Sequence, residues 1–570
     1  MKLSVNSFLF RVLDLLRGNF SIQQSVTFGL QLIAWKKMSQ SANDQSIVGF
    51  LASLPDDLVH LSFDDFRYRY DQLSQNLLTQ ITNMQLDPTE VDYEQLFETM
   101  ASSFKGEGFF YSTSLIRLIQ QLLSMETDSE ELYAPFVCDP GLLHALATNY
   151  SVLAESSFST RFIGLYKIIF DLDFELKNSD PLQAPGYLDA QGLSLRKFVN
   201  TVSIPPFGYR LHKPVDSDIF MRFDEDTLKS RHFEPRVISH IAAQTKEKAI
   251  VGFPESFANQ QSLSKFRANY VANGWVSKVI RLPGNLLNNT ALPCLLFVFD
   301  FANKSDEILM VDASEIYTKH KRNNILTQEE ITAILALCEA PSEKHEFWCK
   351  ASIDDLSANN YNLDPRRYVV SASECEYMAK FKDYEACRLG DLVEIIRPQQ
   401  VNGQENEGET WSEVLCNDIP DFGYMDSVER TKHLTNKELD KAKRYKIFNK
   451  DILLSVRGTI GKVAIVSEAE DKQWYPSQSL VILRPNQQRI VPEYLYLYMK
   501  STLFNTVIDK RAIGSVIRNL SAREIDELQI PMMSLAAQQE LKEQKFQEGE
   551  KLIKVIKEAT AKLNSIADFF

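Results

Sequence analysis

The sequence lacks any apolar stretch of the roughly 20 residues that a membrane-spanning helix requires. It also lacks a Cys-x-x-Cys pair, because its seven cysteines are scattered along the chain. This odd, dispersed set predicts reduced thiols in a cytoplasm and argues against a structural zinc or another metal site. Residues 1–5 form a short apolar patch without a cleavage motif, so we expect no signal peptide. These absences favour a cytoplasmic protein that uses neither a membrane nor a metal.

A surplus of basic residues is also missing, since the formal net charge is −14 over 570 residues. Such acidity normally counts against nucleic-acid binding. The charge is uneven, however, with roughly −8 in residues 391–440 and roughly +6 in residues 441–530. A local basic stripe can still dock a duplex, because phosphate contacts act within about a Debye length.

Length and periodicity predict several domains of mixed type. Apolar residues recur at helical spacing near the start, helix and strand patterns alternate in the middle, and short strands with turns follow. We therefore expect a multidomain α/β protein that ends in one long amphipathic helix. The expected segments are a helical bundle at 1–105, an α/β domain with a parallel sheet at 106–345, a connector at 346–375, an α+β domain at 376–535 and a terminal helix at 536–570.

Residues 202–208 read Val-Ser-Ile-Pro-Pro-Phe-Gly. This stretch resembles the Asn-Pro-Pro-Phe-Gly loop of adenine-N6 DNA methyltransferases, with Ile204 at the place of the catalytic Asn. The resemblance implies that the Asn amide oxygen would accept a hydrogen bond from the adenine amino group, while Phe207 would stack on a flipped base. Isoleucine has no acceptor. The loop therefore keeps the family's shape without its chemistry, at Ser203, Ile204, Pro205, Pro206 and Phe207.

Several further phrases occur in the order found in type I restriction-modification methylation subunits. They include Leu13–Gly18 near the start, then 249–254, 279–286 and 309–314. A phrase Asn-Leu-x-x-x-Arg-Tyr follows at 362–368. The resemblance implies a Rossmann-like, methyltransferase-type domain behind a helical N-terminal domain.

The cofactor phrases of that family are altered in this sequence. The family's S-adenosylmethionine loop, Asp-Pro-x-Cys-Gly-x-Gly-Gly, lets the backbone approach the ligand. The matching stretch 134–143 loses glycines in either possible register. The family's Gly-x-Glu, whose Glu binds the ribose hydroxyls, is matched to Gly164-Leu165-Tyr166. We therefore expect no bound cofactor, with degenerate positions at Cys138, Asp139, Pro140, Gly141 and Tyr166.

Residues 376–535 resemble one target recognition domain of a type I specificity subunit. The phrases that carry the resemblance include Ser455–Ala464, Pro476–Leu480 and Gly514–Ser521. The resemblance implies binding of double-stranded DNA, with Lys and backbone amides on phosphates and Arg available for guanine. The acidic stretch 402–410 is not expected to face DNA. The candidate DNA-binding residues are Lys441, Lys443, Arg444, Lys446, Arg457, Lys462, Lys510, Arg511 and Arg518.

The preferred hypothesis is a DNA-binding protein of a restriction-modification-like or other prokaryotic defence system, with an inactive methyltransferase-like scaffold. One alternative is an active S-adenosylmethionine-dependent adenine-N6 DNA methyltransferase, with Asp139 and Ser203 compensating for the altered motifs. Another is a protein-binding assembly subunit. The apolar face of 541–563 predicts either packing of the helix on its own domain or pairing in a homodimer or with other subunits of a defence complex.

Overall fold

The computed structural model divides the chain into two compact units, Met1–Val369 (unit 1) and Val370–Phe570 (unit 2). No described helix is long and apolar enough to cross a lipid bilayer. The residues that the structure describes are 2–40, 46–104, 111–158, 160–211, 217–287, 291–320, 323–339, 346–370, 384–402, 408–425, 427–467, 469, 471–511 and 519–567.

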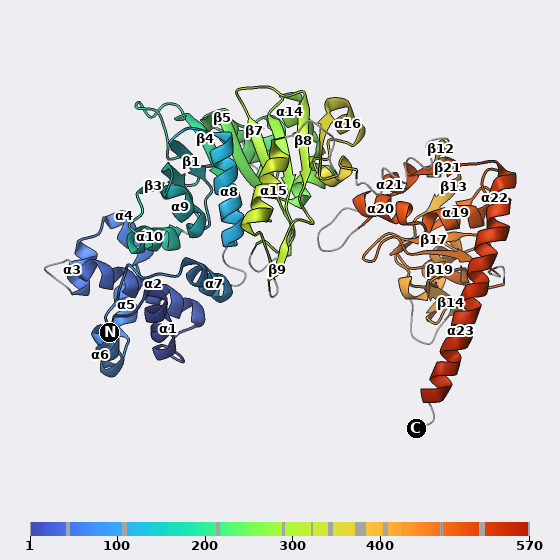
Figure 1. Cartoon of the computed structure of the whole chain (residues 1–570), viewed down its shortest axis with the longest axis horizontal. Coiled ribbons are helices and arrows are strands. Elements are labelled where there is room, and N and C mark those ends of the chain that lie inside the picture. Colours follow the sequence, from blue (N-terminus) through green and yellow to red (C-terminus); the bar gives the residue numbers. More distant parts are fainter. Residues whose placement is uncertain are drawn as a thin grey trace. The chain divides into compact units, whose positions relative to one another are not determined.

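Unit 1 begins with a group of helices (blue in Figure 1). Helix α2 starts at a capping box, in which Ser21 and Gln24 each bond the other's backbone N–H, and it is buried along most of its length. Phe28, Phe63 and Phe66 fill the core around it. The helices are α1 (Val5–Leu15), α2 (Ile22–Ser39), α3 (Ile47–Ala52), α4 (Asp56–Ser62), α5 (Phe66–Asp71), α6 (Gln75–Asn83) and α7 (Tyr93–Ser103).

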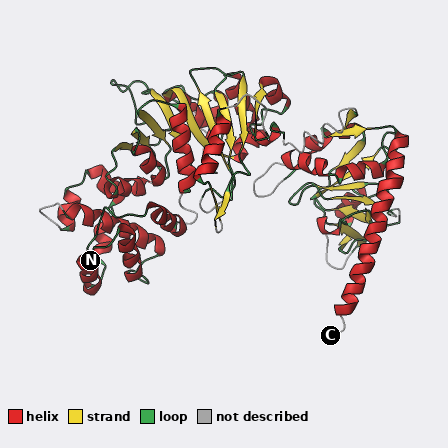
Figure 2. Cartoon of the chain, in the orientation of Figure 1, coloured by secondary structure: helices red, strands yellow, loops and turns green. Residues whose placement is uncertain are grey.

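A nine-stranded sheet follows in unit 1, between helices on both faces (Figure 2). Its strands are β11 (Trp348–Ser352), β8 (Glu307–Asp312), β6 (Val276–Arg281), β7 (Cys294–Asp300), β5 (Thr245–Pro254), β4 (Phe198–Ser203), β1 (Glu131–Pro135), β2 (Ser151–Glu155) and β3 (Phe174–Lys177), in their order across the sheet. A separate hairpin joins β9 (Thr318–His320) to β10 (Asn323–Ile325).

Alternate residues of the central strands face two different cores, as expected for a sheet that is covered on both sides. In β5, Ile250 joins one core while Val251 and Phe253 join the other. The first core contains apolar residues of α8 (Thr113–Glu126), α9 (Pro140–Ala147) and α15 (Gln328–Cys338). The second core contains residues of α12 (Phe233–Gln244), α13 (Glu255–Asn259), α14 (Ser264–Ala272) and α16 (Ile353–Ala358). Two further helices are α10 (Thr160–Ile169) and α11 (Glu225–Lys229).

The sheet differs from the sequence expectation in two respects. Strand β7 is antiparallel to both β5 and β6, and the described residues between β6 and β7 form no helical crossover, which a parallel pair would require. Residues 346–369, the larger part of the connector expected at 346–375, supply β11 as an edge strand, followed by α16 and a short 3-10 helix, Pro365–Arg367. Arg366 also forms ion pairs with Glu255 and with Asp364, both buried, so this segment is part of unit 1.

The described residues of unit 2 form three small sheets and several helices. A five-stranded sheet orders β13 (Val393–Ile396), β20 (Leu480–Pro485), β17 (Ile452–Ser455), β18 (Val463–Val466) and β15 (Tyr424–Met425). A second sheet orders β16 (Thr431–Leu434), β14 (Glu409–Val414) and β19 (Trp474–Pro476), and a third pairs β12 (Glu385–Arg388) with β21 (Gln529–Met532). The helices are α18 (Asn436–Arg444), α19 (Pro492–Met499), α20 (Thr502–Arg511) and α21 (Ala522–Asp526).

The C-terminal helix has two parts with different surroundings. It runs from α22 (Leu535–Leu541) through a π-helical turn (Lys542–Phe546) into α23 (Gln547–Ala567). Phe546 is buried in the core of unit 2, against Tyr424 and Tyr496. Farther along, the helix extends beyond the strands of unit 2 (Figure 1), and Leu552, Val555 and Ile556 are 58–62% exposed. The expected multidomain α/β class, with a long terminal helix, is confirmed.

Candidate functional site

The strand order of unit 1 reverses between β1 and β4. Strands β2 and β3 lie on one side of this pair, and β5 lies on the other. In open α/β sheets, ligands bind beyond the carboxyl ends of the strands at such a switch point. Strand β1 ends just before Cys138 and Asp139, and β4 ends just before Ile204. The fold therefore brings the two predicted motifs, distant in sequence, to one place.

The loop after β4 is enclosed by its neighbours. Ser203 Oγ donates a hydrogen bond to the Pro135 carbonyl over 2.7 Å, which ties the end of β4 to β1. The Ile204 side chain is 1% exposed and belongs to the core of the sheet. Its carbonyl accepts a 2.8 Å bond from the Tyr111 hydroxyl. Pro205 and Pro206 are buried as well, so the loop contributes to the interior of the domain.

The loop after β1 also makes its contacts within the protein. Asp139 caps helix α9 through a 2.7 Å bond from the Leu142 N–H, and its other oxygen accepts the Tyr111 N–H over 2.9 Å. Burial raises the pKa of Asp139 to about 7, although these backbone bonds oppose the shift. Pro140 follows at the first helical position. A Cβ added at Gly141 would come within 3.0 Å of the Phe97 ring, so that ring covers the open face of the glycine.

Tyr166 lies within helix α10 and not at a strand end. Its ring stacks on Phe97, with 5.6 Å between the ring centroids, and its hydroxyl lies 2.5 Å from the Met100 sulfur. Tyr166 is 1% exposed. It therefore packs between the sheet domain and α7 of the N-terminal helices.

An acidic residue stands at the carboxyl end of β2, and it was not predicted from the sequence. Glu155 is fully buried, and its carboxylate accepts 2.7 Å bonds from the hydroxyls of Tyr133 and Ser179. The Gly186 N–H donates to the same group over 2.5 Å. A signal was present, because Glu155 ends the apolar run Val152–Ala154, as a residue at a strand end would.

A buried polar network extends from Glu155 through His240 on α12 to the loop before α11. Tyr133 Oη lies 3.0 Å from His240 Nε2, and Arg222 lies 2.7 Å from His240 Nδ1. Arg222 also pairs with Asp218 over 2.7 Å. Burial, with a smaller effect of Arg222, holds the pKa of His240 well below its usual value. The acceptors at this edge of the sheet are thus satisfied from within the protein.

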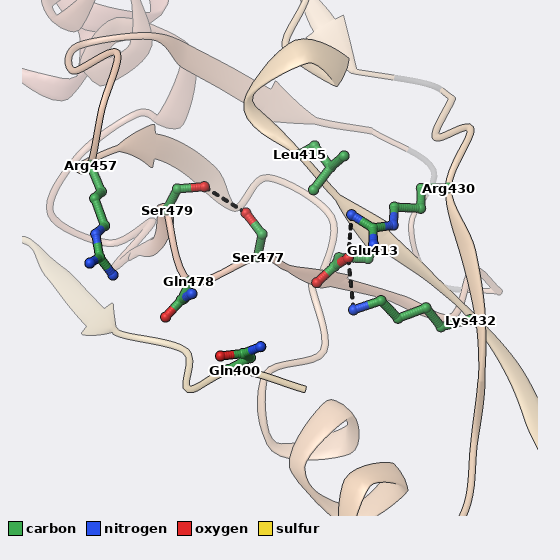
Figure 3. Close-up of a pocket in the computed structure, with 9 residues that line it drawn as sticks. All are labelled: Gln400, Glu413, Leu415, Arg430, Lys432, Arg457, Ser477, Gln478 and Ser479. Atoms are coloured by element: carbon green, nitrogen blue, oxygen red, sulfur yellow. Dashed lines mark hydrogen bonds and ion pairs between the residues drawn. The ribbon is translucent and has the colours of Figure 1, made fainter. Parts of the chain in front are cut away.

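Unit 2 presents a different surface, with two cavities that share Arg457 and Gln478. The first, of about 380 Å³, is shown in Figure 3, and Leu415 is its one apolar lining residue. The second, of about 530 Å³, is also lined by Arg397, Gln399 and Asn519. Because the two cavities share residues, we treat them as one continuous trough.

The candidate basic residues are distributed unevenly around this trough. Arg457 lines both of its cavities. Lys441 pairs with Glu438 over 2.8 Å, and Lys443 lies 3.9 Å from Glu409. Arg444 and Lys462 are exposed, and Lys446 lies 5.9 Å from the ring centre of Phe448. The side chains of Lys510 and Arg511, and all of Arg518, lie outside the described residues.

Most of the residues that line the trough were not predicted from the sequence. The predicted residues came mainly from dense runs of positive charge, whereas the trough combines cations that are isolated in sequence with neutral amides. The available signal was the phrase Pro476–Leu480, which supplies Ser477, Gln478 and Ser479. The lining residues that were not predicted include Arg397, Gln399, Gln400, Arg430, Lys432, Gln478 and Asn519.

Comparison with known proteins agrees with this two-part organisation. Residues 89–377 match the family model described as N-6 DNA Methylase, and residues 382–558 match the one described as Type I restriction modification DNA specificity domain. The chain is 28% identical over 138 residues to the type I restriction enzyme MpnII methylase subunit of Mycoplasma pneumoniae, covering 24% of this chain and 25% of that subunit. It is 26% identical over 135 residues to the EcoBI specificity subunit of Escherichia coli, covering 23% and 28%.

The chain thus spans about a quarter of the length of each of these curated relatives. Among solved structures, the type I restriction-modification methyltransferase subunit of Streptococcus thermophilus superposes with a TM-score of 0.49 at 15% identity, covering 64% of this chain and 99% of that one. The methylase match takes in half of the sequence. The chain therefore belongs to the N-6 DNA methylase family, and a type I restriction modification DNA specificity domain follows in the same polypeptide.

Proposed function

We propose that this protein binds double-stranded DNA through unit 2 and that its methyltransferase-like unit 1 serves as a scaffold without transferring a methyl group. In this proposal the protein acts in a cytoplasmic restriction-modification or other defence system of a prokaryote. The specificity domain match and the polar trough support the DNA-binding part. The packing of the switch point in unit 1 supports the scaffold part.

One observation carries the scaffold proposal. The adenine site of the family needs a hydrogen-bond acceptor at position 204, and a buried isoleucine stands there instead. The carbonyl of the same residue is already bonded to Tyr111. A flipped adenine would therefore lose the amide that selects its amino group, and such a loss removes much of a site's discrimination.

The residues around the cofactor loop do not fit S-adenosylmethionine. A ligand over Gly141 would have to displace the Phe97 ring, which is itself stacked on Tyr166. Glu155, the acidic residue at the end of β2, already accepts three hydrogen bonds from within the protein.

Family membership supports the runner-up, an active adenine-N6 methyltransferase that uses S-adenosylmethionine. Asp139 and Ser203 would be the residues that restore activity, but both make buried structural bonds. Isothermal titration of the full-length protein with S-adenosylmethionine at about 1 mM decides between the two proposals. We expect no binding heat, and micromolar binding would overturn the scaffold proposal. A titration of the same preparation with duplex DNA serves as the control for folded protein.

We also propose that α23, through its exposed residues Leu552, Val555 and Ile556, pairs with the same helix of a second copy. These three side chains form an apolar stripe that is exposed to solvent. In a dimer with a twofold axis, the stripes of the two copies would cover each other. A dimer would also supply two specificity domains in one assembly. The alternative, an assembly subunit that binds protein through unit 2 in place of DNA, predicts no affinity for duplex DNA at low salt.

A further inference from the structure

The trough in unit 2 is built by segments that are far apart in sequence. Gln399 and Gln400 follow β13, Arg457 follows β17, and Gln478 lies in the loop between β19 and β20. Asn519 forms an isolated bridge with Arg457. Three of the phrases that the sequence analysis singled out, at 455–464, 476–480 and 514–521, thus contribute to one surface.

The positive charge of the trough is not equally available. Arg430 and Lys432 lie 3.3 and 2.9 Å from the carboxylate of Glu413, as the dashed lines in Figure 3 show. Arg397 donates to the Leu520 carbonyl over 2.6 Å. Arg457 is exposed, and within the described part of the chain it has no ion pair. It is therefore the cation of the trough best placed to meet a phosphate.

Neutral amides are the second feature of the trough. Gln400 and Gln478 line the first cavity together (Figure 3), and Gln399 lines the second. All three side chains are exposed. Gln400 donates to Asn402 over 3.2 Å, while no described residue bonds the Gln478 amide. An uncharged amide gains little from a phosphate, but it matches the paired donor and acceptor on the major-groove edge of adenine.

The lining also argues against a small-molecule site. Pockets for small ligands are lined mainly by apolar and aromatic side chains, with a few polar groups. Here the proportions are reversed, since polar residues line both cavities almost throughout. A polar, cationic surface that includes exposed amides suits the edge of a nucleic acid better than an enclosed ligand.

From this arrangement we propose that the trough is where unit 2 recognises base edges. Gln400 and Gln478 contact the major-groove edges of A·T base pairs, and Arg457 binds a flanking phosphate. The proposal rests on DNA binding by unit 2 and adds the residues that distinguish one sequence from another. It also separates their role from that of the basic residues on α18, which would act on any sequence.

The test uses the full-length protein and selection from a pool of random duplexes, followed by affinity measurements on the selected sequence at several salt concentrations. The double variant Gln400→Ala/Gln478→Ala should lose about 5- to 100-fold of its preference at one or two A·T positions while its salt dependence stays unchanged. Arg457→Ala should weaken binding to all sequences and reduce the salt slope by about one. The matched control Gln487→Ala/Gln488→Ala removes two exposed amides outside the trough and should change neither property.

The outcomes separate this inference from the proposal on which it rests. If the wild-type protein binds no duplex DNA at low salt, the DNA-binding proposal itself fails. If the wild-type protein selects a sequence and the double variant selects the same one with equal preference, base recognition lies elsewhere and the inference is overturned. A loss of preference confined to G·C positions would overturn the assignment of the glutamines to adenine. Thermal unfolding of each variant checks that the fold is intact.

Discussion

The candidate site residues of the family phrases are mostly buried in unit 1 and mostly exposed in unit 2. In unit 1, Asp139, Tyr166 and Ile204 are buried and packed against their neighbours. In unit 2, Arg457 and Gln478 stand at the surface beside cavities. A buried polar group is stable only when it is bonded, whereas an exposed one is available to a partner. The motif positions of unit 1 therefore support the fold, and those of unit 2 can support binding.

This difference predicts the largest effect at Phe97, which covers Gly141 and stacks on Tyr166. Phe97→Ala should lower the free energy of unfolding by about 3–5 kcal/mol, because it opens a cavity in a packed core. Arg457→Ala, in unit 2, should change that quantity by no more than about 0.5 kcal/mol. Urea unfolding measures both changes. Equal losses of stability at the two positions would contradict the proposed difference between the two units.

The second prediction concerns position 204. Ile204→Asn restores the residue type of the family motif, but it places an amide in a buried apolar site. We expect a loss of about 1–3 kcal/mol of stability and no methyl transfer to adenine. A radiolabelled methyl-transfer assay on duplex DNA measures the activity, and Ile204→Val serves as the apolar control. Recovery of methyl transfer in the Asn variant would show that the cofactor site is intact.

Within unit 2, the same contrast between buried and exposed residues divides the C-terminal helix. Leu552→Lys with Val555→Lys should weaken self-association at least tenfold, about 1.4 kcal/mol, because it charges the exposed stripe without touching Phe546. A chain ending near Ser534 is a less specific test, since it would remove Phe546 from the core of unit 2. Light scattering at micromolar concentrations gives the oligomeric state. A monomeric wild-type protein would contradict self-pairing, and the apolar stripe would then be available to a different subunit.

The smallest effect is expected from the basic residues on and after α18. Replacing Lys443, Arg444 and Lys446 by Ala should reduce DNA affinity about three- to tenfold and lower the salt slope, because these side chains are near the surface. Lys443 lies near Glu409, which limits its share of the effect. The control replaces three exposed cations of unit 1 by Ala, namely Arg67, Lys229 and Lys265. An unchanged salt slope would exclude a phosphate role for the cluster.

Local patterns predicted the class of the fold well. Strands β5 to β8 lie in the segment for which alternating helix and strand patterns predicted a sheet, because strands that are covered on both faces are rich in apolar residues. The antiparallel direction of β7 was not predicted. Strand direction depends on the connection between strands, and the apolar pattern of a strand does not reveal it. Strand β11 was taken as part of a connector because a short edge strand carries a weak pattern.

The sequence by itself determined which chemical groups are present. It showed that position 204 has no amide and that the chain carries methylase-like and specificity-like phrases. Only the tertiary structure decided which of these groups are available. Glu155 at a strand end, the Phe97 ring over Gly141 and the presence of Gln400 and Gln478 in one cavity all depend on how distant segments pack together. Burial and hydrogen bonding are properties of such contacts, so a linear motif names the groups but not their surroundings.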